Sequence, residues 1–238
     1  MAALAMGRPR HARASRERLY INTAFGLPVA GPDGFFNHLM EYLVAPLGYD
    51  VTIQAPPAER ALLLADSGVD DGDGPRIPGL TRQYPNLIRV PEPVMDVEFV
   101  AFTKRLVFDT HDWASLTPYS VAMVTGWKIL ERNIRTHEEL LRVKHPEGLF
   151  RLLNDGRTEV AVIDRFSGHA MARTVGLEHY NVLSPPLATT PMYLYLHEKH
   201  TRLVPRVAAR LRDAKAKGIY GRLKREKLDH AYLDDSLR

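Results

Sequence analysis

The chain has 238 residues, of which 45% are hydrophobic and 25% are charged, the proportions of an ordinary folded protein with one large domain or two smaller ones. It contains no cysteine, which excludes disulfides, thiolate metal ligands and cysteine nucleophiles. No run of apolar residues reaches the length that a membrane-spanning helix needs.

The net charge of +4 is concentrated in two basic segments. Residues 1–18 carry five arginines against one glutamate, and residues 199–227 carry eleven lysines and arginines against two acids, so the rest of the chain has a net charge of −9. Such segments either bind nucleic acid or anionic lipid, or form a disordered arm and the solvated face of a helix. Because aromatic residues do not alternate with these cations, we expect no nucleic-acid partner. We expect residues 1–18 to be a disordered arm.

The N-terminal half alternates between strand and helix patterns. Residues 35–47 place apolar side chains at helical spacing, and Gly48 ends this pattern. A second helix is predicted to start after Pro57 and to end at Gly68, before an acidic loop over residues 71–76. Strands are predicted over residues 19–24, 49–54 and 94–103, and residues 78–92 are expected to be irregular.

The C-terminal half continues the alternation. Strands are predicted over residues 119–124, 159–163, 180–183 and 192–197. Helices are predicted over residues 127–133, 149–154, 167–173 and 203–217, with a short basic helix after them. Strands that alternate with helices in this way predict an α/β protein with largely parallel sheets.

Residues 59–74 and 148–164 form a near-repeat. Each copy has a leucine-rich helical segment, a glycine where the helix should stop, a short strand position and an acidic residue or loop. Glycine ends helices because it adopts the left-handed conformation without a Cβ clash. A carboxylate at the carboxyl end of a strand lies where open α/β sheets bind ligands. The near-repeat therefore predicts two α/β lobes that face each other across a cleft.

The order of elements and several motifs resemble the type II periplasmic solute-binding proteins, specifically bacterial extracellular solute-binding family 3, which serves polar amino acid uptake. The resemblance covers about residues 19–225. Its motifs are AERAL at 58–62, SGVDDG at 67–72, VEFVAF at 97–102, SVAMVTGW at 120–127, NDGRTEVAVID at 154–164 and KGIY at 217–220.

The resemblance implies two lobes, each a mostly parallel sheet flanked by helices, joined by two hinge strands. Lobe 1 would comprise residues 19–97 plus 196–238, and lobe 2 residues 98–195. The implied function is capture of a small polar or anionic, amino-acid-like solute for ABC-type uptake, without catalysis, cofactor or metal. The implied partners are an ABC transporter permease or a membrane sensor, and the implied form is a periplasmic monomer.

The resemblance also implies the ligand-binding residues. Arg76 would pair with a carboxylate in bidentate fashion, and Asp164 would accept from an ammonium group. The backbone N–H groups of the Gly126–Trp127 turn would add donors at a helix N-terminus. The complete expected set is Phe25, Arg60, Asp73, Arg76, Gly126, Trp127, Asp164 and Arg165.

Structural roles compete with these functional ones. Arg76 could instead form a salt bridge with Asp71 or Asp73, and Asp164 could cap the helix that follows it. In the same way, Arg60 could lie on a solvated face, Trp127 could belong to the core, and Arg165 could neutralise Asp164. The acidic loop also lacks the Gly-x-Thr pair of the amino acid binders, which puts an α-amino acid ligand in question.

Two other functions stay open on the same fold. One is a dehydratase-like enzyme, in which Asp164, Glu98 or His169 would act as acid or base. The other is an intracellular effector-sensing module. Neither the spacing of His197 and His200 nor the acids at 70, 71 and 73 complete a zinc or calcium motif, so no metal is expected.

Overall fold

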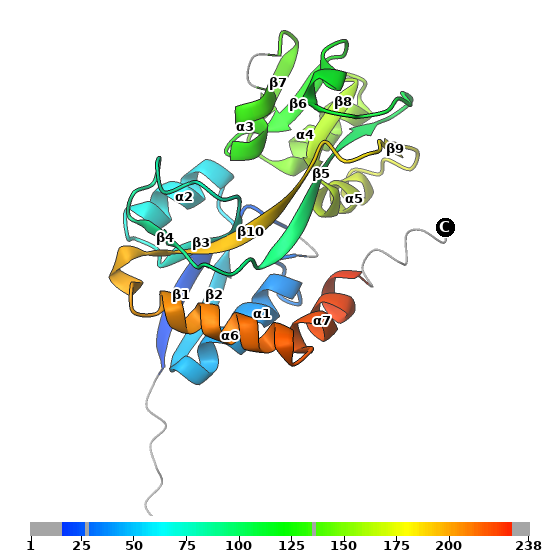
Figure 1. The fold of residues 1–238 in the computed structure, drawn as a ribbon. Helices are drawn as coiled ribbons and strands as arrows, with labels where there is room; N and C mark the ends of the chain where they lie inside the picture. The colour runs from blue at the N-terminus through cyan, green and yellow to red at the C-terminus, as the bar shows by residue number, and fades with distance from the viewer. Residues whose placement is uncertain (1–15, 27–28, 135–136, 230–238) are drawn as a thin grey trace, which may run out of the picture.

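The computed structural model describes residues 16–26, 29–134 and 137–229, and it confirms the predicted two-lobed α/β fold. Two groups of helices and strands are joined by the long strands β5 (Met95–Thr103) and β10 (Ala188–His197), which run side by side between them (Figure 1). In this article lobe 1 is the group around β1 to β4, and lobe 2 is the group around β6 to β9.

The sheet of lobe 1 has the order β2-β1-β3-β10, with β4 also paired to β10. The first three strands are parallel, whereas β10 is antiparallel to β3. Helix α1 buries six apolar residues of its helical stripe in the core, as its spacing predicts. The elements of lobe 1 are β1 (Glu17–Asn22), β2 (Tyr49–Gln54), β3 (Gly72–Arg76), β4 (Leu87–Arg89), α1 (Phe35–Val44), α2 (Ala58–Asp66), α6 (Val204–Ala216) and α7 (Ile219–Lys224).

The sheet of lobe 2 has the order β5-β8-β6-β7. Strands β6, β7 and β8 are parallel, and β5 is antiparallel to β8 and to the short β9. The elements of lobe 2 are β6 (Val121–Val124), β7 (Leu140–Val143), β8 (Val160–Asp164), β9 (Asn181–Val182), α3 (Lys128–Ile134), α4 (Pro146–Asn154) and α5 (Arg165–Thr174). A π-helical turn over Arg225–Asp229 follows α7.

Both connecting strands are shared between the lobes. Strand β10 pairs with β5 over its first half and with β3 and β4 over its second half. Strand β5 pairs with β10 over residues 95–99 and with β8 over residues 99–103. The lobe boundaries expected at 97/98 and 195/196 lie inside these strands and stay a prediction.

The near-repeat is confirmed in its helix ends and corrected in its first acidic loop. Gly68 after α2 and Gly156 after α4 both have a left-handed backbone, with φ of 74° and 70°. Residues 72–76, however, form the buried strand β3 and not a loop. Its sequence GDGPR has no apolar or β-branched residue, so no strand pattern was visible. Its neighbours β1 and β10 pair with its backbone and hold it in the sheet.

Other differences are small. Strand β7 was not predicted, β10 begins four residues earlier than expected, and the irregular stretch contains the three-residue β4. Of the expected disordered arm, residues 1–15 lie outside the described residues, while Glu17 and Arg18 already belong to β1. Within the described ranges no helix has both the length and the apolar composition needed to cross a membrane.

Candidate functional site

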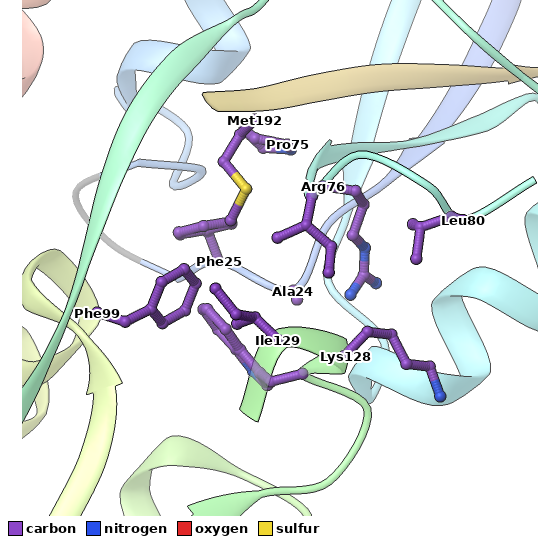
Figure 2. A pocket seen from close by; sticks show the side chains of 11 residues that line it. Ala24, Phe25, Pro75, Arg76, Leu80, Phe99, Lys128, Ile129 and Met192 are labelled. Carbon is purple, nitrogen blue, oxygen red and sulfur yellow. The ribbon is translucent and has the colours of Figure 1, made fainter. Parts of the chain in front are cut away.

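A small cavity lies where the two lobes meet at the connecting strands (Figure 2). Its volume is about 20 Å³, the space of roughly one water molecule. An amino-acid-sized solute would therefore enter only if the lobes moved apart. The lining residues are Ala24, Phe25, Pro75, Arg76, Ile77 and Leu80 of lobe 1, Trp127, Lys128 and Ile129 of lobe 2, and Phe99 and Met192 of the connecting strands.

Two larger hollows lie on the outside of single lobes. One, of about 410 Å³, is lined by residues 104–106, 153–156 and 158–159 of lobe 2. The other, of about 360 Å³, is lined by residues of β1, β2 and the end of α1. Only the small cavity combines residues of both lobes among these three, so it is the candidate site.

Three aromatic residues form the wall of this cavity and are named here the aromatic cluster: Phe25, Phe99 and Trp127. The ring of Trp127 contacts Phe25 edge-on at a centroid distance of 5.1 Å and Phe99 at 5.8 Å. All three are buried. In Figure 2 the side chains of Phe25, Phe99 and Met192 point into the same space. Trp127 thus belongs to the packed core, as one of its expected roles has it, and also lines the cavity, while contact with a ligand stays a prediction.

The guanidinium of Arg76 is already paired with a carboxylate of its own strand. Its Nε and Nη2 each donate to Asp73 at 2.8 Å, and Nη2 also donates to the carbonyl oxygen of Ala58 at 2.9 Å. Asp73 is fully buried and Arg76 is 5% exposed. The salt-bridge role considered from the sequence is therefore the observed one, with Asp73 as the partner.

A bulge in β3 explains this pairing. Arg76 lies opposite Tyr193 and Asp73 lies opposite Tyr195, so three residue steps in β3 match two in β10. The extra residue brings Asp73 and Arg76 to the same face of the sheet, where an unbroken strand would place them on opposite faces.

The turn before α3 brings lobe 2 against the first turn of α2. Gly126 has a φ of 88°, and a Cβ added there would lie 2.4 Å from the backbone nitrogen of Glu59. The two backbones approach this closely only because residue 126 has no side chain. The N–H of Gly126 donates to Glu131 at 2.7 Å, so this predicted anion donor is already occupied.

Next to this contact, Lys128 joins the lobes through charge. Its Nζ lies 2.5 Å from Glu59 of α2 and 3.0 Å from Glu131 of α3. The hydroxyl of Tyr84 donates to the other oxygen of Glu59 at 2.9 Å. We refer to these four residues as the interlobe network. None of the four was predicted as a site residue from the sequence, although Glu59 and Lys128 directly adjoin predicted site residues.

The pKa values of the interlobe network follow from its contacts. Burial alone would lower the pKa of Lys128, but its bonds to Glu59 and Glu131 outweigh burial and raise it. Burial opposes ionisation of Glu59, yet the bonds from Lys128 and Tyr84 outweigh it and lower the pKa. Burial and then the bond to Glu59 raise the pKa of Tyr84 to about 12. The network is therefore charged on Lys128 and Glu59 at neutral pH.

Asp164 ends β8 and caps α5, as one of its two expected roles proposes. Its carboxylate accepts from the backbone N–H of Ser167 at 2.8 Å. The other carboxylate oxygen, Oδ2, has no hydrogen-bond partner among the described residues, although Asp164 is fully buried. Burial raises its pKa to about 6, against the smaller opposite effect of Ser167 and the N–H groups of the first helical turn.

Asp164 lies beside the aromatic cluster. It is directly opposite Phe99 in the antiparallel pair of β5 and β8. Residues opposite each other in such a pair point to the same face, with Cβ atoms roughly 5 Å apart. Since Phe99 lines the cavity, the structure brings Asp164 next to the site, although it does not line the cavity itself.

The two remaining predicted residues do not line the cavity. Arg60 is exposed on α2, because the helical period buries Ala58, Ala61 and Leu62 and turns residue 60 outward. The expectation that it faces the cleft is thus corrected. Arg165 is paired with Glu98 at 2.7 Å, so it does not neutralise its neighbour in the sequence.

The candidates for catalysis and metal binding have other partners. Glu98 is held by Arg165, and Nδ1 of His169 lies 2.7 Å from the hydroxyl of Tyr180. Neither lines the cavity. Within the described ranges no three metal-ligand side chains gather. The three acids of the SGVDDGDG segment diverge: Asp70 accepts from Asn22, Asp71 pairs with Lys199 and His200, and Asp73 pairs with Arg76.

Comparison with known proteins supports the fold. No family model matches the chain. An uncharacterised protein of Shewanella oneidensis is 28% identical over 198 residues, which cover 78% of this chain and 72% of that protein.

Several solved structures share the fold of this chain but are distant from it in sequence. A histidine kinase sensor domain with similarity to periplasmic binding proteins aligns with a TM-score of 0.76 at 17% identity, over 91% of this chain and 98% of that one. A mutant of ArgBP from T. maritima aligns with a TM-score of 0.75 at 16% identity, over 89% and 95%. An ABC transporter substrate-binding protein from Streptococcus pneumoniae with bound histidine aligns with a TM-score of 0.73 at 17% identity, over 89% and 92%. The chain has the two-lobed fold of the type II periplasmic binding proteins.

Proposed function

We propose that the protein is a solute-binding protein that captures a small molecule between its two lobes. The observation that carries this proposal is the cavity at their junction, lined by residues of both lobes and of both connecting strands. A solute bound there would contact Phe25 and Arg76 from one side and Trp127 from the other, with Asp164 beside it. The structural comparisons add support, since an ArgBP and a histidine-bound substrate-binding protein share the fold.

Binding would involve a hinge motion. The cavity of about 20 Å³ is too small for an amino-acid-sized solute, so β5 and β10 would bend to separate the lobes. The contacts that would open are Phe25 with Trp127 and Glu59 with Lys128. Contacts to the solute would replace them. The closed conformation around the solute would then differ from the open one, and a partner protein could recognise it.

The closed form would be recognised by a membrane protein. Two kinds of partner are proposed, an ABC transporter permease and a membrane sensor, because both a transporter substrate-binding protein and a kinase sensor domain share the fold. The proposed location is the periplasm, and the proposed role is binding by a monomer without catalysis. Loss of solute uptake in a deletion strain would favour the permease, and loss of a transcriptional response with uptake intact would favour the sensor.

The test is ligand-dependent closure. The chain has no cysteine, so Leu63→Cys on α2 and Leu141→Cys on β7 place one spin label on an exposed site of each lobe. A panel of amino acids, amines and organic acids is screened by thermal shift and calorimetry. A ligand that binds should change the distance between the labels. A Val107→Cys and Leu141→Cys pair within lobe 2 should keep its distance. Turnover of a compound without any ligand-dependent closure would refute the proposal.

A further inference from the structure

The aromatic cluster is suited to a positively charged ligand group. The faces of Phe25, Phe99 and Trp127 carry partial negative charge and attract ammonium groups that come within about 6 Å of the ring centres. The ring of Trp127 now contacts those of Phe25 and Phe99, with centroid distances of 5.1 and 5.8 Å. Separation of the lobes would part Phe25 from Trp127 and open a space with rings on both sides.

The charged side chains at the cavity do not favour an anion. Among the described residues, Arg76 and Lys128 are the two cations that line it. The guanidinium of Arg76 is held by both oxygens of Asp73, and Lys128 is held by Glu59 and Glu131. A ligand carboxylate would have to displace one of these buried or partly buried carboxylates, which would then lose its own partner. With both cations compensated, an anionic head group gains little at this site.

A carboxylate without a full set of partners lies on the same side of the sheet. Asp164 is fully buried beside Phe99, and its Oδ2 accepts from no group among the described residues. Its neighbour Arg165 pairs with Glu98, so that this arginine does not compensate the charge of Asp164. Among the described residues, the two cations that line the cavity are thus outnumbered by the carboxylates next to them, Asp73, Glu59, Glu131 and Asp164. A buried carboxylate with a free oxygen gains a partner when an ammonium group binds next to it.

From the proposed function and these three observations together, we infer that the site selects a cation: an ammonium or methylated ammonium group on an apolar body, with no requirement for a carboxylate. The rings and Met192 contact the apolar body, and Asp164 balances the charge. The ligand class is thus an amine, in place of the small polar or anionic, amino-acid-like solute that the family resemblance implies.

The test compares ligands that share one body and differ in the charged group. One set is phenethylamine, phenylalanine and phenylpropionate, a second is isopentylamine, leucine and isocaproate, and choline serves as a methylated cation. Of the two tryptophans, Trp113→Phe leaves only Trp127, so its fluorescence reports binding at the cavity. We expect at least one of the two amines to bind at least about tenfold more tightly than the amino acid and the acid with the same body, or choline to bind at least about tenfold more tightly than every amino acid and acid in the set.

Variants assign the preference to the site. Asp164→Asn keeps a good helix cap and should weaken amine binding about tenfold while leaving the acids unchanged. Phe99→Leu, checked for folding by circular dichroism, should weaken the amines as well. Asp155→Asn removes an exposed carboxylate of lobe 2 and should have no effect.

The outcomes separate the two proposals. If an amino acid or an acid binds as tightly as its amine, the cation inference is wrong and the solute-binding proposal stands. If an amine binds best but Asp164→Asn and Phe99→Leu leave its affinity unchanged, the assigned site is wrong. If no compound in any charge class binds, both proposals fail.

Discussion

Asp73 in β3 and Asp164 in β8 belong to the same near-repeat, one in each lobe, and both are fully buried. Asp73 is paired through both oxygens with Arg76. Asp164 uses one oxygen to cap α5 and leaves the other without a partner among the described residues. The same local pattern therefore produces one neutralised and one uncompensated carboxylate.

The two carboxylates differ in whether the side chain of the nearest arginine reaches them. The bulge in β3 turns Arg76 to the face of Asp73, three residues away. Arg165 is adjacent to Asp164 in the sequence, yet it lies in the first turn of α5 and reaches Glu98 of β5. Proximity along the chain does not decide whether a buried charge is compensated.

The largest expected effect comes from breaking the compensated pair. Asp73→Asn leaves the guanidinium of Arg76 charged and only 5% exposed, with no carboxylate partner. We expect the free energy of unfolding, measured by urea denaturation, to fall by about 3–5 kcal/mol. The double variant Asp73→Leu with Arg76→Met should recover most of this loss, because it removes both buried charges. A single variant as stable as the original chain would contradict the pairing.

A smaller effect is expected at the uncompensated carboxylate, in the pH dependence of stability. Burial raises the folded-state pKa of Asp164 to about 6, above its ordinary value of 3.8, so the folded chain binds this proton more tightly than the unfolded chain. The free energy of unfolding therefore falls as pH rises from about 4 to about 6, by up to about 3 kcal/mol.

Asp164→Asn should remove this part of the pH dependence while keeping the helix cap. Urea denaturation at several pH values measures it, with Asp155→Asn as the exposed control. If Asp164→Asn keeps the slope of the original chain, the carboxylate does not titrate as its burial requires.

The contact between the lobes can be broken at Gly126. Gly126→Ala forces a left-handed residue to carry a Cβ, and that Cβ would meet the backbone of Glu59 at 2.4 Å. Gly156→Ala has the same left-handed strain with nothing within 4 Å of the new Cβ. We expect both to lose about 1–2 kcal/mol of stability, but only Gly126→Ala to lengthen the distance between labels at positions 63 and 141. An equal distance in both variants would show that this contact does not hold the lobes together.

The smallest effect is expected at the interlobe network. Lys128→Met removes the cation between Glu59 and Glu131. Because Glu59 is partly exposed, we expect a stability change below about 1 kcal/mol, together with a broader distribution of the interlobe distance. Arg151→Met, which breaks an exposed pair with Glu147 inside lobe 2, should leave that distribution unchanged. If the interlobe distance of Lys128→Met is distributed as narrowly as that of the original chain, the interlobe network does not help to hold the lobes together.

Patterns with a strong period were predictable from the sequence. Residues 35–44 form α1 because their apolar side chains recur at helical spacing, and Gly68 and Gly156 end their helices with left-handed backbones. Strand β3 was not predictable, because GDGPR carries no side-chain period and its strand conformation comes from pairing with β1 and β10. Strand β7 was missed for a related reason, since it has only four residues and none of them is fully buried.

The site was predictable in its region and not in its contacts. Phe25, Arg76 and Trp127 line the cavity, and Gly126 and Asp164 lie next to it, whereas Arg60 turns away by one helical step. The sequence by itself determined the alternating elements, the glycine helix ends and the two-lobed fold, because these depend on local periodicity and backbone freedom. Only the tertiary structure decided that Arg76 is neutralised and Asp164 is not, because charge compensation depends on which side chains the sheet register brings to the same buried face.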